Sequence, residues 1–262
     1  MTVDLKSGEK MNRKFSFIRR YLCSSVLGVL IFFLSPLTAG SFSIPEKLVY
    51  DLTWTGVKAG TATLEINNDK DLLKIISTAR SADWVSVFYT VEDRIESKLS
   101  RTRTTSIVGL PQNYRIKTRE GRHRRDNEVI FDIEKRKAFF INHIDGKKKN
   151  ADIEENTFDP LSCLYYVRTL KIETGKSVFV NIFDSKKMWN VEVQVLRKEK
   201  IETPLGSFDT VVIKPLMKSE GIFNRKGDMY IWLTDDEKHV PVKMQTKVAV
   251  GSITATLVSG TY

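Results

Sequence analysis

The chain has 262 residues, of which 28% are charged and 41% are hydrophobic, and its formal net charge is +10. This length is normal for a single all-β domain with a large core. Its two cysteines are Cys23 and Cys163. Because Cys23 lies in the N-terminal segment described next, the rest of the chain can hold neither an intrachain disulfide nor a thiolate metal cluster. We expect Cys163 to be a buried structural thiol.

The first 40 residues have the order of a secretory signal peptide. A basic region ends at Arg19-Arg20, an apolar run covers 21–37, and small residues follow at 38–40. A retained membrane anchor is the alternative, because the apolar run reaches the lower length limit for a spanning helix. We predict a signal peptide at 1–40 and a single domain at 41–262, in the periplasm of a Gram-negative bacterium. Without the segment the net charge is +6.

From residue 47 onward the chain alternates apolar and polar residues in short segments, which is the period of half-buried strands. In the first segment, 47–55, Tyr50, Leu52 and Trp54 share a face. A turn is expected at 67–71, and 81–89 fits a short helix better than a strand. Further strands are predicted at 62–66, 72–78, 92–101, 104–110, 114–120, 129–133 and 138–144.

One helix is predicted after this first set of strands. Asp159 can cap its N-terminus, Pro160 suits its first position, and Gly175 lies beyond its end. Leu161, Leu164, Tyr165 and Arg168 fall on one stripe of such a helix.

Strands resume after the helix at 178–182, 189–195, 201–205, 208–212 and 253–257. The most distinctive is a hairpin over 230–244, in which 230–233 is aromatic and β-branched and the acidic run 234–237 forms the turn. Pro241 belongs at the beginning of the returning strand or at a sheet edge. Many short strands at spacings of about 8–12 residues indicate an all-β fold. We predict a large antiparallel, strongly curved sheet closing into a barrel or half-barrel, with one or two short helices as plug or lid.

Four stretches of this sequence resemble a bacterial exported family, domain of unknown function 3108. They are 48–54 with Ala59-Gly60, 159–168, 203–208, and 231–242. The resemblance covers most of residues 46–260 and implies an exported β-rich envelope protein. It brings no catalytic residues and no established activity. The expected architecture is also similar to the half-barrels of periplasmic lipoprotein carriers, a fold analogy that transfers no function.

Catalytic motifs are missing from the sequence. It contains no Gly-x-Ser-x-Gly elbow, no His-Glu-x-x-His and no glycine-rich phosphate loop. Asp235-Asp236 could bind a divalent cation or act as an acid/base pair, but a tight turn accounts for both residues without chemistry. We therefore expect no enzyme activity, no metal and no cofactor.

A basic run over 115–125 is the strongest charge feature. It could bind phosphate-bearing lipid or another anionic polymer. Alternatively, it is a solvated outer face of the sheet. Nucleic acid is not expected as a partner of an exported chain without a recognised binding module. The candidate anion-binding residues are Arg115, Lys117, Arg119, Arg122, Arg124 and Arg125.

Six aromatic residues could line an interior cavity for an acyl chain or another apolar ligand, or could pack as an ordinary core. They are Trp54, Trp84, Phe88, Tyr89, Trp189 and Trp232. The preferred hypothesis is a non-enzymatic periplasmic protein that binds an apolar or amphipathic ligand such as a lipid. The alternative is an assembly partner of envelope proteins with a packed interior. Membrane contact is expected only through an uncleaved signal segment.

Overall fold

The computed structural model describes residues 42–101, 108–185, 187–216, 228–248 and 250–262. The predicted signal peptide lies outside these residues. The described residues form one compact unit. Within the described ranges, no helix has the length and apolar character needed to cross a membrane.

The described residues form fifteen strands and two helices. The helices are α1 (Asp83–Ser86) and α2 (Pro160–Arg168). The strands, in chain order, are β1 (Glu46–Trp54), β2 (Val57–Asp69), β3 (Leu72–Ser81), β4 (Val91–Ser100), β5 (Pro111–Glu120), β6 (His123–Asp132), β7 (Lys137–Asn142), β8 (Lys148–Asp152), β9 (Thr157–Phe158), β10 (Ser177–Phe183), β11 (Met188–Thr203), β12 (Gly206–Leu216), β13 (Met229–Thr234), β14 (Pro241–Lys247) and β15 (Ser252–Thr261).

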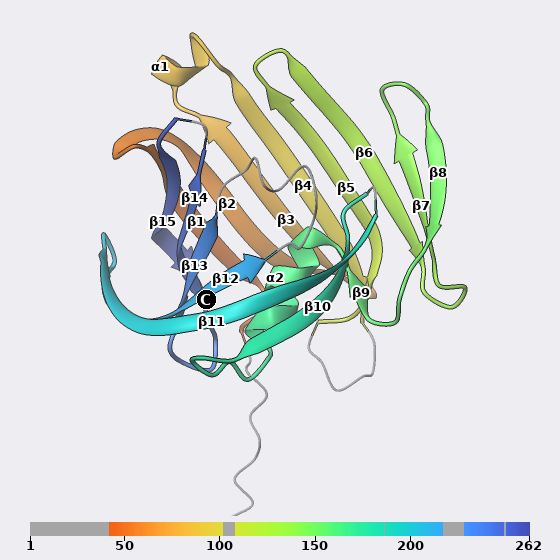
Figure 1. Cartoon of the computed structure of the whole chain (residues 1–262). Coiled ribbons are helices and arrows are strands. Elements are labelled where there is room, and N and C mark those ends of the chain that lie inside the picture. The colour runs from red at the N-terminus through yellow and green to blue at the C-terminus, as the bar shows by residue number, and fades with distance from the viewer. Residues whose placement is uncertain (1–41, 102–107, 186, 217–227, 249) are drawn as a thin grey trace, which may run out of the picture. The chain divides into compact units, whose positions relative to one another are not determined.

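All strands belong to one sheet in the order β8-β7-β6-β5-β4-β3-β2-β1-β15-β14-β13-β12-β11-β10-β9 (Figure 1). Each pairs antiparallel with its neighbours, except that β9 pairs parallel with β10. The first and last strands therefore meet in the middle of the sheet. The prediction of a large antiparallel sheet is confirmed. Closure into a barrel is not seen in the described residues, because β8 and β9 remain as the two sheet edges.

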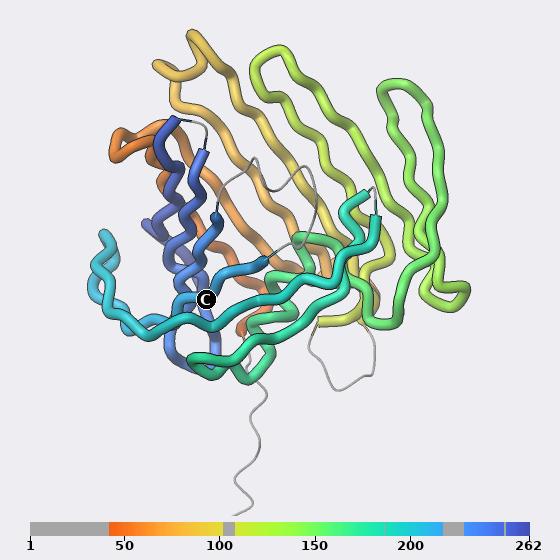
Figure 2. Tube along the Cα trace, in the orientation of Figure 1, coloured from red at the N-terminus to blue at the C-terminus, as the bar shows by residue number. Residues whose placement is uncertain are grey.

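The face of the sheet that carries the core is set by the two-residue alternation. On β3, Leu73 and Ile75 are buried. On the opposite arm of the sheet, Val191, Val193 and Val195 of β11 are also buried. Both groups belong to one large apolar cluster that also includes residues of α2. Figures 1 and 2 show β10 and β11 passing in front of α2 while β3 to β5 pass behind it. The inner face of the curved sheet is thus filled around α2.

Local chemistry fixes where α2 begins. The carboxylate of Asp159 accepts from the backbone N–H of Leu161 and of Ser162, both at 2.9 Å, and Pro160 occupies the first helical position. Ser97 of β4 donates its hydroxyl to the same carboxylate at 2.6 Å. One buried cap therefore both starts the helix and ties it to the sheet.

The other end of α2 is held by a buried ion pair. The guanidinium of Arg168 makes two hydrogen bonds of 2.7 Å to the carboxylate of Glu46 in β1, and both side chains are 0% exposed. The guanidinium also lies 4.5 Å from the ring centroid of Phe42 and 5.0 Å from that of Tyr165. Burial of this kind demands near-complete pairing, which the bidentate geometry supplies.

The hairpin between β13 and β14 is confirmed, and its acidic turn has a structural role. Asp236 accepts from the hydroxyl of Thr234 at 2.7 Å and from the backbone N–H of Lys238 and His239 at 3.0 and 3.1 Å. The carbonyl of Lys238 then accepts from Arg168 Nε at 3.2 Å. The turn therefore seats the C-terminal end of α2, and Pro241 begins β14 as predicted.

Three sequence predictions need correction. Of the strand predicted at 104–110, residues 104–107 lie outside the described residues, and residues 108–110 are not strand. Pro111 begins β5 and does not end a strand. The turn predicted at 67–71 is shorter, because β2 continues to Asp69. The helix ends at Arg168, and it is buried on several sides, including Ser162 and Val167, instead of along one stripe.

Candidate functional site: a basic groove on the outer face of the sheet

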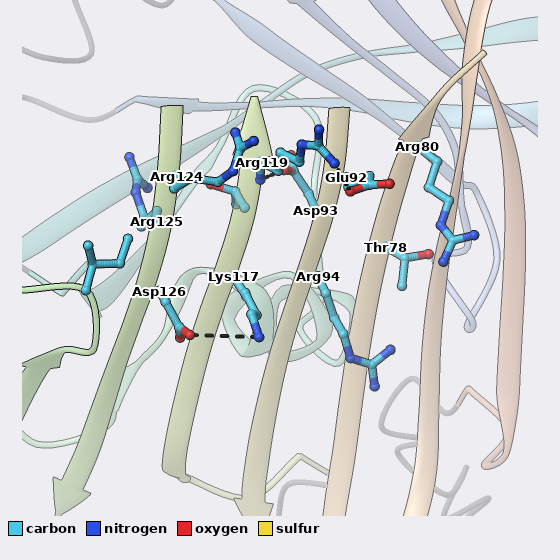
Figure 3. Close-up of a pocket in the computed structure, with 12 residues that line it drawn as sticks. Thr78, Arg80, Glu92, Asp93, Arg94, Lys117, Arg119, Arg124, Arg125 and Asp126 are labelled. Carbon is cyan, nitrogen blue, oxygen red and sulfur yellow. Dashed lines mark hydrogen bonds and ion pairs between the residues drawn. The ribbon is translucent and has the colours of Figure 1, made fainter. Parts of the chain in front are cut away.

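A groove of about 590 Å³ lies across β3, β4, β5 and β6 (Figure 3). Two rows of paired residues form its floor. One row runs Thr78, Arg94, Lys117, Asp126, and the other runs Arg80, Glu92, Arg119, Arg124. Strand alternation places both rows on the face opposite Ser97, whose hydroxyl contacts α2. The groove is therefore on the outer face, away from the packed interior, and α2 appears behind the strands in Figure 3.

Positive charge exceeds negative charge in this groove. The lining includes Arg80, Arg94, Lys117, Arg119, Arg124 and Arg125 against Glu92, Asp93 and Asp126. Arg125 and Asp93 alternate to the opposite face, so five cationic and two acidic side chains on the outer face leave an excess of three positive charges.

Two cations of the groove keep their charge largely uncompensated. Arg80 makes no ion pair with any residue of the described part of the chain. Arg124 donates to the carbonyl oxygens of Gly121 and His123, at 2.8 and 3.0 Å, so main-chain atoms orient it without neutralising it. Such groups are free to take an anion.

The charge of Lys117 is also only weakly compensated, because the carboxylate nearest to it already binds Arg115. The Nζ of Lys117 lies 4.0 Å from Asp126, whereas Arg115 holds that carboxylate with hydrogen bonds of 2.9 and 3.1 Å. The hydrogen bond from Arg115 keeps the pKa of Asp126 below its usual value, although partial burial opposes this shift. Arg119 does have an exposed partner, Glu92, at 3.1 Å.

The pKa of Asp93 is shifted upward. Partial burial, followed by the nearby charge of Glu120, raises its pKa to about 6, while the backbone N–H of Arg119 and the charge of Arg125 oppose the shift. Below that pH the carboxyl becomes neutral. By the alternation of β4, Asp93 lies on the face of Ser97, opposite the two rows of the groove.

Four of the six residues predicted to bind anions line this groove: Lys117, Arg119, Arg124 and Arg125. Arg115 lies in the next row, paired with Asp126. Arg122 is exposed in the turn between β5 and β6.

The sequence prediction missed Arg80 and Arg94. They come from strands that read as ordinary alternating segments, and only the register of four paired strands brings them beside the basic run.

The six predicted aromatic lining residues are not gathered around one cavity. Trp232 is buried in the core, and its indole N–H donates to Glu199. Trp189 is half-buried, with the Lys187 ammonium 3.9 Å from its ring centroid. The remaining four are exposed near connections between strands: Trp54, Trp84, Phe88 and Tyr89.

Other candidate groups have structural settings. Asp235 pairs with Lys198 at 2.7 Å, and Asp236 belongs to the turn described above, so the turn interpretation of this pair is confirmed. Burial raises the pKa of the Cys163 thiol to about 12, as expected for a structural cysteine. No cluster of three or more potential metal-binding His, Cys, Asp or Glu side chains occurs among the described residues.

Comparisons with known proteins place the fold. A solved structure of a β-barrel-like protein from Brucella abortus, a domain of unknown function (DUF1849), aligns with a TM-score of 0.53 at 13% identity, covering 83% of this chain and 97% of that one. A Bacteroides fragilis protein described as exported, with a YmcC-like fold, aligns with a TM-score of 0.33 at 9% identity, covering 84% and 97%. No curated protein matches the chain significantly. The family described as protein of unknown function DUF3108 matches residues 49–258, so the chain belongs to this family.

Proposed function

We propose that this chain is an exported, non-enzymatic protein of the Gram-negative periplasm that binds a phosphate-bearing amphipathic molecule of the envelope. The head group lies in the basic groove on the outer face of β3 to β6. The single observation that carries this proposal is the excess of three positive charges in a groove of about 590 Å³. The basic region and apolar run before residue 41 support export.

The chemistry of the groove suits a phosphate group. Arginine side chains present planar pairs of N–H donors that match phosphate oxygens. Arg80 and Arg94 enter from neighbouring strands on one side, and Lys117 and Arg119 enter from β5. A tetrahedral anion in the groove can therefore receive donors from several strands at once.

The filled inner face of the sheet supports a ligand on the outer face. Tyr165 and Val167 of α2 are buried within the same apolar cluster as Leu48 of β1 and Val193 of β11. An acyl chain on the inner face would have to displace this packing. The same observation favours a second candidate function, an assembly partner that uses the groove to bind an acidic surface of another envelope protein.

A short-chain phosphatidylglycerol below its micelle concentration is a suitable probe. Its binding to the full chain can be followed by titration calorimetry, with the double variant R80Q/R94Q as the test. Each exposed charge contact contributes about 0.5–1 kcal/mol, so we expect the double variant to bind roughly 5- to 30-fold more weakly.

The chain offers a closely matched control. Arg197 pairs with Glu199 two residues along β11 at 2.7 Å and is 51% exposed, as Arg94 pairs with Glu96 at 2.6 Å and is 50% exposed. R197Q removes an equivalent charge outside the groove and should leave binding unchanged. Equal weakening by R197Q, or no binding of the probe to the wild type, would contradict the proposal. Capture of an acidic envelope protein that R80Q/R94Q abolishes would favour the assembly function instead.

A further inference from the structure

Exposed apolar side chains gather at one end of the sheet. In an antiparallel meander, the β1–β2, β3–β4 and β14–β15 connections lie at the same end. Eight large apolar residues on or next to these connections are exposed, and we call them the aromatic rim. They are Trp54, Val57, Trp84, Val87, Phe88, Tyr89, Val250 and Ile253.

Hydrogen bonds hold the three connections of the rim in one arrangement. The indole N–H of Trp54 donates to the carbonyl of Val250 at 2.8 Å, which joins the β1–β2 and β14–β15 connections. The indole N–H of Trp84 donates to the carbonyl of Lys58 at 2.9 Å, which joins α1 to β2. Both indole donors are satisfied, so the rings present mainly carbon to the surroundings.

The tip of the rim is its most exposed part. Val87 is 76% exposed and Phe88 is 85% exposed, immediately after the short helix α1. Their side chains make little contact with the core. Keeping such residues exposed gains nothing for the fold, and contiguous apolar patches of this kind mark contact sites.

The basic groove adjoins the rim. The ring of Tyr89 lies 2.8 Å from the position that a Cβ on Gly121 would occupy, and Gly121 N–H donates to the carbonyl of Thr90 at 2.8 Å. The row that contains Arg119 and Arg124 is the row of the groove nearest to this turn. Apolar and aromatic tips therefore stand beside a cationic surface.

We propose that the aromatic rim is the contact surface of this protein for a bilayer that contains anionic phospholipid. The apolar tips enter the boundary between head groups and acyl chains, the tryptophans and Tyr89 lie at head-group level, and Arg119 and Arg124 face lipid phosphates. The charge complementarity with anionic head groups selects a lipid surface among possible partners. This contact is additional to the uncleaved signal segment expected from the sequence, and it does not depend on a ligand in the groove.

The test compares the full-length protein with two variants on vesicles of phosphatidylethanolamine and phosphatidylglycerol. V87S/F88S removes the apolar tip, and the control F179S removes a phenylalanine of β10 that is 59% exposed away from the rim. From the apolar area lost, we expect V87S/F88S to reduce vesicle partitioning about 30- to 100-fold. F179S should partition like the wild type, and vesicles of phosphatidylcholine alone should bind the wild type less.

Hydrogen exchange with bound vesicles gives a readout that a retained N-terminal segment does not disturb. In the wild type, residues 54–57 and 82–90 should be protected by the vesicles, and V87S/F88S should lose this protection. Unchanged exchange at the rim overturns the proposal, as does equal protection in V87S/F88S. Loss of groove binding in R80Q/R94Q without loss of rim protection would leave this inference standing alone.

Discussion

The buried pair of Glu46 and Arg168 makes a quantitative prediction. Both side chains are 0% exposed and share two hydrogen bonds of 2.7 Å. R168M removes the guanidinium and leaves the Glu46 carboxylate buried without a cation. Breaking a buried pair in this way costs about 3–5 kcal/mol of unfolding free energy, and E46M should cost a similar amount.

The double variant E46M/R168M separates the cost of an unpaired charge from the value of the pair itself. Replacing both members with apolar side chains of similar length removes the uncompensated charge, and such replacements are commonly neutral or stabilising. We expect the double variant to lie within about 2 kcal/mol of the wild type, because the further losses are the hydrogen bond from Arg168 to the Lys238 carbonyl and the contacts of the guanidinium with the Phe42 and Tyr165 rings. The coupling energy between the two positions is then about 4–10 kcal/mol.

Urea unfolding followed by tryptophan fluorescence measures this cycle. With a slope of about 3 kcal/mol per molar urea, each single variant should lower the midpoint by about 1–1.7 M, whereas the double variant should recover most of that loss. Additive losses in the double variant would refute the reasoning. They would show that each side chain acts through separate contacts instead of through the pair.

Three further predictions concern carboxylates. D159A should lower the unfolding free energy by about 2–4 kcal/mol, because α2 loses its cap and the buried hydroxyl of Ser97 loses its acceptor. D159N should lower it by less. An equal loss in the two variants would contradict the role of the cap. Asp93 has a folded pKa of about 6, above the unfolded value of about 3.9, so the folded state binds this proton more tightly and the contribution of Asp93 to stability should rise as pH falls from about 7 to about 4. D93N should flatten this slope in urea midpoints measured across that range, and parallel profiles would exclude Asp93 as its source. D236A should cost about 1–2 kcal/mol because two backbone N–H groups and the Thr234 hydroxyl lose their acceptor, and an unchanged melting temperature would argue against the structural role of this turn.

Strands and the helix start could be predicted because their causes are local. Alternation every second residue follows from a sheet with one buried face, and β3 and β11 obey it directly. Asp159 and Pro160 fix the beginning of α2 through contacts within three residues. The exposure of Trp54 was less predictable, because alternation gives the face of a residue but not its distance from the core. β1 keeps one register with β15 from Tyr50 to Trp54, so Trp54 shares the face of Tyr50 but lies exposed at the end of the strand.

The groove could be predicted only in part for a different reason. The basic run on β5 and β6 is continuous in the sequence, so the four groove residues that it supplies could be predicted. Arg80 and Arg94 join it through the pairing registers of β3, β4 and β5, which depend on the lengths of connections that alternation does not determine. The Glu46–Arg168 pair is beyond local inference altogether, since 122 residues separate its members.

The pairing of β1 with β15 has a consequence for biosynthesis. Tyr50 aligns with Leu257, so the edge of β1 that faces β15 has no partner strand until residues 252–261 have been synthesised. Both flanks of the molecule can assemble beforehand, but the seam joining them closes last. Contacts of such large sequence separation make for slow folding. A chain cut short before residue 252 would leave two unsatisfied strand edges at its centre, which is a direct route to aggregation.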